Sequence, residues 1–336
     1  MKNIKTQILS VGSYLPEQVI KSDDLLVDMD SERQYNIPYD WMSKTMGIIE
    51  RRVAPTNANP SDLAIPAAKK AIENANINPD DIDLVIFSGI ERDCPEPATA
   101  HLIQSSLGLH STFAFDVANA CYGFVDAINI ALKFINSNSV KYALIVTGEV
   151  PTRVLHTVHE KLKKGIDPET AKKLIGGLSV GDAGGAVILG PSLDGNTGFE
   201  VLQSGSESRH SRKCYYKFDE NGNFDGQMLM GHMAALMHSK HNKLFNDTLD
   251  KLGWSEFDWV LSHQIGLKPF ERLREMSGIK SNRMIKTYPY LGNITTATFP
   301  VSFEVMANSG KVRLGERIGG FFGGSGVVYG QFGYTF

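Results

Sequence analysis

The sequence has few cysteines, and their spacing matches no pattern of disulfide-bonded cysteines. Cys94, Cys121 and Cys214 are an odd number at wide spacing, so we expect neither a disulfide framework nor a CxxC metal site. The histidines are scattered without a cysteine or carboxylate at ligand spacing, so no bound metal is expected either. Each cysteine is therefore either a residue that only packs in the core or a reactive thiol.

Long apolar runs and a strong net charge are also missing. No stretch approaches 18 apolar residues, and the apolar residues 8–11 are too few for the core of a signal peptide. We therefore expect a cytoplasmic protein with no membrane span. A net charge of −3 gives no basic field for nucleic acid, so no nucleic-acid partner is expected.

What is present is a regular alternation of helical and strand patterns. Residues 59–90 read as a helix through residue 72, a stop at Asn78 and Pro79, and an apolar strand over 83–90. Residues 140–150 are a continuous apolar run, which is typical of a strand buried on both faces of a sheet. This pattern predicts an α/β fold with helices on both sides of a sheet.

The second part of the chain resembles the first. Residues 249–266 repeat the helix, turn and apolar strand of residues 59–90, and the glycine-rich 180–190 resembles 321–333. We therefore predict two related halves, 1–179 and 180–336. The polar, helical stretch 151–179 is expected to cap a site, and residues 208–227 read as loops and a hairpin.

Cys121 lies where a β-like run, residues 112–117, turns into an apolar helical run. A sulfur near a helix N-terminus is expected to favour the thiolate, and the neighbours Ala118, Ala120 and Gly123 are small enough for a sharp turn. The alternative is a cysteine that only packs in a core, where free cysteine is common.

Two further residues lie at positions where α/β proteins commonly have their active sites, at strand ends and in the loops that follow them. His263 ends the apolar run "WVLSH", and Asn293 follows a glycine in a turn that leads into a helix. Each has a structural alternative, because a single histidine is often only packed and a Gly-Asn pair is often only a turn.

The order of Cys121, His263 in "HQ" and Asn293 in "GN", with the closing "FFGGSGVVYG", resembles the β-ketoacyl-ACP synthase III branch of the thiolase-fold condensing enzymes. The segments "DWMSKTMGIIERRVAP" (40–55) and "GDAGGAVIL" (181–189) extend the resemblance over nearly the whole chain. The resemblance implies a thiolase-like, five-layered α/β/α/β/α fold in two similar halves, assembled as a homodimer. It also implies acyl thioester substrates, an acyl carrier protein as partner, and no cofactor.

The resemblance assigns roles to these residues. Cys121 would take an acyl group from a thioester, and the acyl oxygen would be held by backbone N–H groups of Cys121 and of the Gly324/Ser325 loop. His263 and Asn293 would donate hydrogen bonds to the thioester oxygen of the second substrate and so stabilise its enolate.

Glu96 in "EPATA" departs from the chain-initiating synthases, which have an apolar residue here, and resembles the branch that joins two acyl thioesters, including olefin- and pyrone-forming enzymes. A donor that does not lose CO₂ must lose a Cα proton, so Glu96 is the predicted base. The alternatives are a solvated loop acid beside Arg92 and Asp93, and a decarboxylating enzyme that extends acyl-CoA with malonyl-ACP.

Other positions match the family unevenly. Trp41 and Lys268 correspond to substrate-binding and carrier-docking residues, whereas Thr45 replaces the arginine of the coenzyme A clamp and Gly266 replaces an asparagine after the catalytic histidine. A third reading is a non-catalytic partner of a heterodimer. Such partners are expected to lose the nucleophile or its helpers, and Cys121 with both helpers is present here.

Overall fold

The computed structural model describes residues 5–220 and 224–336. The elements up to the cap are β1 (Thr6–Tyr14), β2 (Gln18–Lys21), α1 (Ser22–Asp28), α2 (Ser31–Tyr35), β3 (Glu50–Val53), α3 (Pro60–Ala75), β4 (Ile82–Ser88), α4 (Thr99–Ser106), β5 (Phe113–Val117), α5 (Gly123–Asn136), β6 (Tyr142–Glu149), α6 (Thr152–Lys163) and α7 (Pro168–Leu174). The remaining elements are β7 (Ala183–Pro191), β8 (Gly198–Ser206), β9 (Cys214–Phe218), β10 (Phe224–Met228), α8 (Met230–Leu252), β11 (Trp259–Ser262), α9 (Leu267–Ser277), α10 (Tyr288–Leu291), α11 (Thr298–Ala307), β12 (Arg317–Gly324) and β13 (Val328–Thr335).

Two main sheets carry the fold and share one pairing pattern. The first has the strand order β1-β7-β6-β4-β5 and the second β8-β13-β12-β11, read from matching edges. In both, the first three strands pair antiparallel and the third pairs parallel with the fourth. The predicted similarity of the two halves is therefore present in the topology.

The division between the sheets does not fall at the predicted boundary of 179 and 180. β7 lies beyond residue 179, yet it pairs with β1 and β6 in the first sheet. The chain passes to the second sheet between β7 and β8, since β7 pairs with β1 and β6 and β8 pairs with β13.

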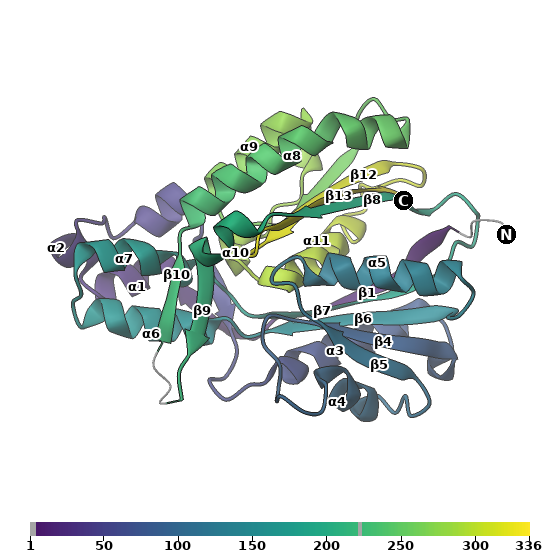
Figure 1. The fold of residues 1–336 in the computed structure, drawn as a ribbon, viewed down its shortest axis with the longest axis horizontal. Helices are drawn as coiled ribbons and strands as arrows, with labels where there is room; N and C mark the ends of the chain where they lie inside the picture. The colour runs from purple at the N-terminus through teal and green to yellow at the C-terminus, as the bar shows by residue number, and fades with distance from the viewer. Residues whose placement is uncertain (1–4, 221–223) are drawn as a thin grey trace.

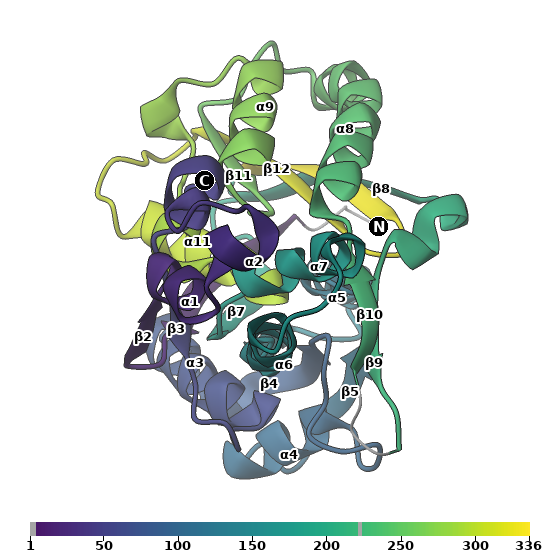
Figure 2. The ribbon, with the colours of Figure 1, turned by 90° about the vertical axis from the view of Figure 1, so that its left-hand side faces the viewer.

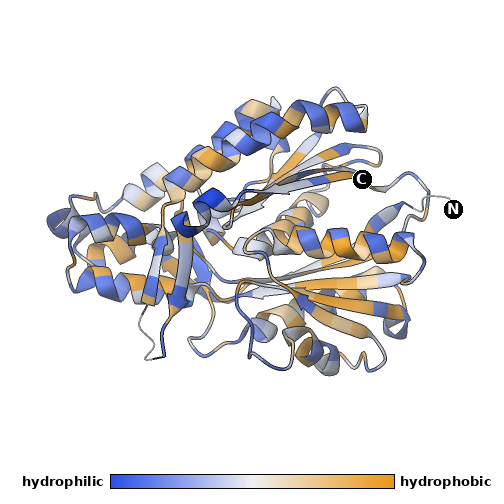
Figure 3. Ribbon diagram, in the orientation of Figure 1, coloured by the Kyte–Doolittle hydropathy of each residue, from blue (hydrophilic) through white to orange (hydrophobic). Residues whose placement is uncertain are grey.

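The elements form five layers, as Figure 1 shows. Helices α3 and α4 cover the outer face of the first sheet, and α8 and α9 cover that of the second. α5 and α11 lie between the two sheets, where Phe299 stacks on Phe124 with ring centroids 5.5 Å apart. Apolar residues accordingly concentrate on the strands and on α5 (Figure 3). The predicted α/β, thiolase-like five-layered fold is confirmed.

A group of smaller elements gathers at one end of the two sheets. Helices α1, α2, α6 and α7 and the β9–β10 hairpin lie there together in Figures 1 and 2. The stretch 151–179 is helical as predicted, and the predicted hairpin is β9 paired antiparallel with β10. The buried carboxylate of Asp182 fixes this end, since it accepts hydrogen bonds from the backbone N–H groups of Ala54 and Thr152.

No helix in the described parts of the chain is both long and apolar enough to cross a membrane.

Candidate active site

The predicted site residues follow the carboxyl ends of strands from both sheets. Cys121 follows β5, His263 follows β11, and Gly324 ends β12. β4, β5 and β6 run parallel to one another, as do β11 and β12, so their carboxyl ends face one region. The two halves therefore contribute residues to the same place.

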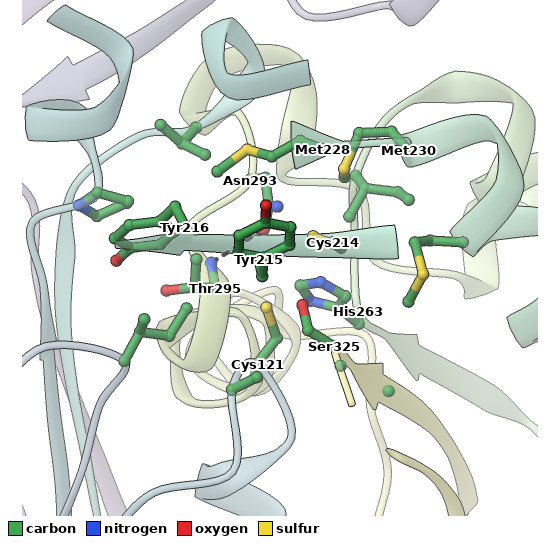
Figure 4. A pocket seen from close by; sticks show the side chains of 18 of the residues that line it. Cys121, Cys214, Tyr215, Tyr216, Met228, Met230, His263, Asn293, Thr295 and Ser325 are labelled. Atoms are coloured by element: carbon green, nitrogen blue, oxygen red, sulfur yellow. Dashed lines mark hydrogen bonds between the residues drawn. The ribbon is translucent and has the colours of Figure 1, made fainter. Parts of the chain in front are cut away.

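A cavity of about 880 Å³ occupies this region. Cys121, His263, Asn293, Gly324 and Ser325 all line it, so the five residues predicted from distant parts of the sequence share one space. Figure 4 shows the Cys121 sulfur and the His263 ring directed into it, and Asn293 lines the same cavity. The arrangement brings a thiol, an imidazole and a carboxamide around a single cavity.

A sharp turn presents Cys121 to the cavity. Ala120 has a φ of 47°, in the left-handed region that non-glycine residues rarely adopt. The turn closes with hydrogen bonds from Tyr122 N to Asn119 O and from Gly123 N to Ala120 O, of 3.2 and 3.1 Å. Of the small residues predicted to allow this turn, Gly123 has a steric reason, since a Cβ there would lie 2.5 Å from Ser88 Oγ.

The protonation state of Cys121 differs from the sequence expectation. Burial raises the pKa of the Cys121 thiol, and the nearby Cys214 and Glu149 raise it further. Helix α5 begins two residues later at Gly123, and the loss of water around the sulfur acts against the thiolate that the field of its N-terminus favours. The resting group is a neutral thiol rather than a thiolate.

His263 is held by the second sheet and is also neutral. Its backbone N–H donates to the Phe321 carbonyl at 2.9 Å, which fixes the residue beside β12. Burial lowers the pKa of the imidazole to about 4, so the ring is uncharged near pH 7. Its Nδ1 has no hydrogen-bond partner within residues 5–220 and 224–336.

Asn293 is fixed by its backbone and by its own side-chain oxygen. Gly292 before it has a φ of 65°, and a Cβ there would lie 2.5 Å from Ser179 O, so only glycine fits. Asn293 N donates to Ser179 O at 2.8 Å, and Asn293 Oδ1 accepts from Thr295 N at 3.1 Å. Because the oxygen is engaged, the side-chain amide nitrogen is the group left to donate.

The backbone of Gly324 lies against the backbone of Cys121. A Cβ on Gly324 would lie 3.0 Å from Cys121 N and 3.1 Å from Tyr122 N. Tyr122 N already donates to Asn119 O, so the absence of a side chain leaves room in front of the Cys121 amide nitrogen, which is what a small anionic oxygen would need.

Glu96 is the predicted residue that the structure does not bring to the cavity. Its side chain is exposed, and the residues just before it, from Ile90 to Pro95, line the cavity in its place. Within one chain, Glu96 is therefore outside the site.

A second cavity of about 530 Å³ adjoins the first. Both predicted substrate-binding residues, Trp41 and Lys268, line it, and so do the departures Thr45 and Gly266. The two cavities share the lining residues Gly176, Met228, Met230, Ala234, Ile265 and Pro269. A molecule in the second cavity can therefore extend into the first.

Several lining residues were not predicted. β9 places Cys214, Tyr215 and Tyr216 on the cavity, and Glu91 and Arg153 join from the ends of β4 and β6. Glu91 and Arg153 could have been predicted from the sequence, because each follows an apolar strand, and residues after strands commonly form the active sites of α/β proteins. No group of three or more His, Cys, Asp or Glu side chains in the described chain is arranged to hold a metal ion.

Comparison with known proteins places the chain in a family. Residues 115–209 match the 3-oxoacyl-[acyl-carrier-protein] synthase III model, and residues 249–333 match the model of its C-terminal part. The β-ketoacyl-[acyl-carrier-protein] synthase III of Xanthomonas oryzae pv. oryzae is 30% identical over 345 residues, covering 97% of this chain and 99% of the relative. That of Pectobacterium atrosepticum is 29% identical over 340 residues, covering 96% and 99%.

Solved structures show the same fold. Cerulenin-bound OleA of Xanthomonas campestris superposes with a TM-score of 0.92 at 23% identity, covering 99% of this chain and 97% of that chain. A cysteine-to-serine OleA variant with bound lauric acid and lauroyl-CoA has a TM-score of 0.91 at 22% identity, covering 99% of each chain. The chain belongs to the 3-oxoacyl-[acyl-carrier-protein] synthase III family and is a thiolase-superfamily condensing ketosynthase, an acyltransferase that forms carbon–carbon bonds.

Proposed function

We propose that this enzyme loads an acyl group on Cys121 and joins it to a second acyl thioester in a Claisen condensation. The observation that carries the proposal is the convergence of Cys121, His263 and Asn293, from both halves of the chain, on one cavity. The cavity volume of about 880 Å³ is near the upper end of the range for small-molecule sites, which suits two acyl chains. The chemistry uses thioester substrates and no cofactor.

In the loading step, the Cys121 sulfur attacks the thioester carbonyl and expels the carrier thiol. Because the resting thiol is neutral, its proton must leave during attack, and the uncharged imidazole of His263 can accept it. His263 then passes this proton to the sulfur of the departing carrier, so the carrier leaves as a thiol and the imidazole is neutral again. The acyl oxygen becomes negative and lies at the space in front of Cys121 N that Gly324 leaves open, beside the Ser325 loop.

In the condensing step, the second thioester loses a Cα proton and its enolate carbon attacks the acyl carbonyl on Cys121. The bond from that carbonyl to the Cys121 sulfur breaks, and the thiolate regains the proton that the base removed. Neutral His263 and the amide nitrogen of Asn293 donate hydrogen bonds to the enolate oxygen. Glu96 is the proposed base. Since Glu96 is exposed in its own chain, this role needs a second copy of the chain to bring it to the cavity, as in a homodimer.

A second candidate is decarboxylative extension of acyl-CoA with malonyl-ACP. It is favoured by the relatives at 29% and 30% identity, which are named β-ketoacyl-[acyl-carrier-protein] synthase III. In that reaction the leaving CO₂ generates the carbanion, so no base is needed. The acyl carrier protein would dock where Trp41 and Lys268 line the second cavity.

One pair of incubations separates the two reactions. The enzyme is given two acyl thioesters without malonate, or acyl-CoA with malonyl-ACP, and products are identified by mass spectrometry. A β-keto or cyclised product without malonate supports the first proposal. A product only with malonyl-ACP overturns it in favour of the second, and Cys121→Ala should abolish acyl loading in either case.

The base is tested by mixing variants. Glu96→Gln is expected to load acyl groups normally and to lose condensation, whereas Glu73→Gln, an exposed carboxylate change on α3, should have no effect. If Glu96 acts in a partner's cavity, co-expressed Glu96→Gln and Cys121→Ala chains should recover part of the activity, because one mixed site is intact. Normal condensation by Glu96→Gln would overturn the assignment.

A further inference from the structure

The cavity wall carries a charged group that the proposed reaction does not use. The Glu91 carboxylate accepts a hydrogen bond from the Tyr216 hydroxyl at 3.1 Å and another from Arg153 Nη1 at 3.3 Å. These residues come from three separate segments, the loop after β4, helix α6 and strand β9. All three line the cavity that holds Cys121, and Figure 4 shows Tyr216 beside that cysteine's pocket.

This group is largely removed from bulk water. The Glu91 side chain is 18% exposed, and burial raises the pKa of its carboxyl and that of the Tyr216 hydroxyl. The neighbouring lining residues include the apolar Ile90, Pro151 and Val154 and the charged Arg92 and Asp93. A carboxylate in such surroundings is costly unless its oxygens are hydrogen-bonded.

The hydrogen bonds already present leave acceptor capacity open. A carboxylate offers about four lone-pair sites, and the two bonds from Tyr216 and Arg153 occupy half of that number. The single hydrogen of the Tyr216 hydroxyl is directed to Glu91, and Arg153 Nη2 donates to the Ala58 carbonyl. Each Glu91 oxygen therefore has one partner and can accept a further hydrogen bond from a group in the cavity.

An unsubstituted alkyl chain cannot donate such a hydrogen bond. It would cover the carboxylate and leave its open lone pairs without water or partner. A hydroxyl on the acyl chain would donate to Glu91 and restore the lost hydrogen bond, whereas a ketone would only bring a second acceptor.

We propose that Glu91, held by Arg153 and Tyr216, is a subsite for a hydroxyl group, so that hydroxyacyl thioesters are the preferred acyl substrates. The inference rests on the proposed function, since it concerns the acyl group that Cys121 receives. A polar site of this kind discriminates mainly by rejecting the analogue that lacks the hydroxyl, because the buried acceptor is then left unpaired.

The test measures acyl loading on Cys121 by intact mass, which is separate from condensation. The wild-type enzyme is offered dodecanoyl-CoA in competition with dodecanoyl-CoA carrying a hydroxyl at C3, at C5 or at the chain end. We expect at least one hydroxylated thioester to load ten-fold faster than the unsubstituted one. Glu91→Leu should reduce that ratio to within two-fold while still loading dodecanoyl-CoA, and Glu73→Leu on α3 should keep the wild-type ratio.

Other outcomes overturn the proposal in distinct ways. Equal wild-type loading of all the thioesters would remove the subsite but leave the proposed function intact. Equal slowing of every substrate by Glu91→Leu would reduce the group to a structural brace between α6 and β9. An unchanged loading ratio with lost condensation would make Glu91 a base. If none of the thioesters loads on Cys121, both the subsite and the proposed function are refuted.

A second variant keeps the test usable if Glu91→Leu does not fold. Glu91→Gln preserves the shape of the side chain and one acceptor oxygen, so the hydroxyl preference should fall at least three-fold without vanishing. An undiminished preference in Glu91→Gln with the wild-type melting temperature would also refute the subsite.

Discussion

A methyl group on Gly324 is the sharpest perturbation of the proposed oxyanion site. In Gly324→Ala the new Cβ would lie 3.0 Å from Cys121 N, 3.1 Å from Tyr122 N and 3.3 Å from the Ala120 side chain. An oxyanion must approach amide nitrogens to about 2.7–3.1 Å, so the methyl group would occupy the volume that the oxygen needs. Loss of such a donor costs about 2.7–4 kcal/mol, which corresponds to roughly 10²- to 10³-fold in acyl transfer.

The assay compares two reactions of the same sulfur. Acyl loading from a thioester passes through an oxyanion, whereas alkylation by iodoacetamide does not. Gly324→Ala should therefore slow loading by roughly 10²- to 10³-fold while alkylation of Cys121 changes by less than about five-fold. Equal slowing of both reactions would show that the methyl group only blocks the thiol. Unchanged loading would refute the placement of the oxyanion beside Gly324.

Two further predictions follow from the buried titratable groups. Since burial raises the pKa of the Cys121 thiol, its alkylation by iodoacetamide should rise about ten-fold for each pH unit from 7 to 9, and a plateau near neutral pH would contradict a neutral thiol. Burial lowers the pKa of His241 to about 3, compared with an ordinary value of 6.5. Between these two values the unfolded chain binds a proton that the native chain does not, so the free energy of unfolding decreases as the pH is lowered below about 6.5. Between pH 7.5 and pH 5 the wild type should therefore lose about 2 kcal/mol more than His241→Leu, measured by urea unfolding, and equal losses would contradict the assignment.

The sequence was informative wherever a signal was local. Cys121 at a strand-to-helix turn, His263 at a strand end and Asn293 after a glycine were all found, because backbone geometry within a few residues determines these placements. The two-half architecture was also predictable, since both halves repeat the same order of apolar runs. The boundary at residue 179 differed because the pairing of β7 depends on contacts with β1, which is far away in sequence.

The protonation state of Cys121 and the position of Glu96 could not be predicted from nearby residues in the sequence, because both depend on distant parts of the structure. The helix N-terminus could be predicted from sequence, but the burial that raises the pKa of the thiol comes from the cavity wall, and a further rise comes from Cys214 on a distant hairpin. Glu96 lies on the surface of one chain, so its proximity to any cavity depends on assembly. Tyr216 was missed because the side of a hairpin that faces inward is set by packing rather than by its polar sequence.

Desolvation acts on both reactive groups in a way that favours condensation. It keeps the Cys121 thiol protonated and the His263 ring unprotonated, so the resting site holds no charge at these two residues. A charged imidazolium would donate its proton to the carbanion and end the reaction. A neutral imidazole stabilises the enolate oxygen by a hydrogen bond and leaves the carbanion free to attack. In the proposed mechanism, burial of His263 therefore selects carbon–carbon bond formation over protonation of the donor.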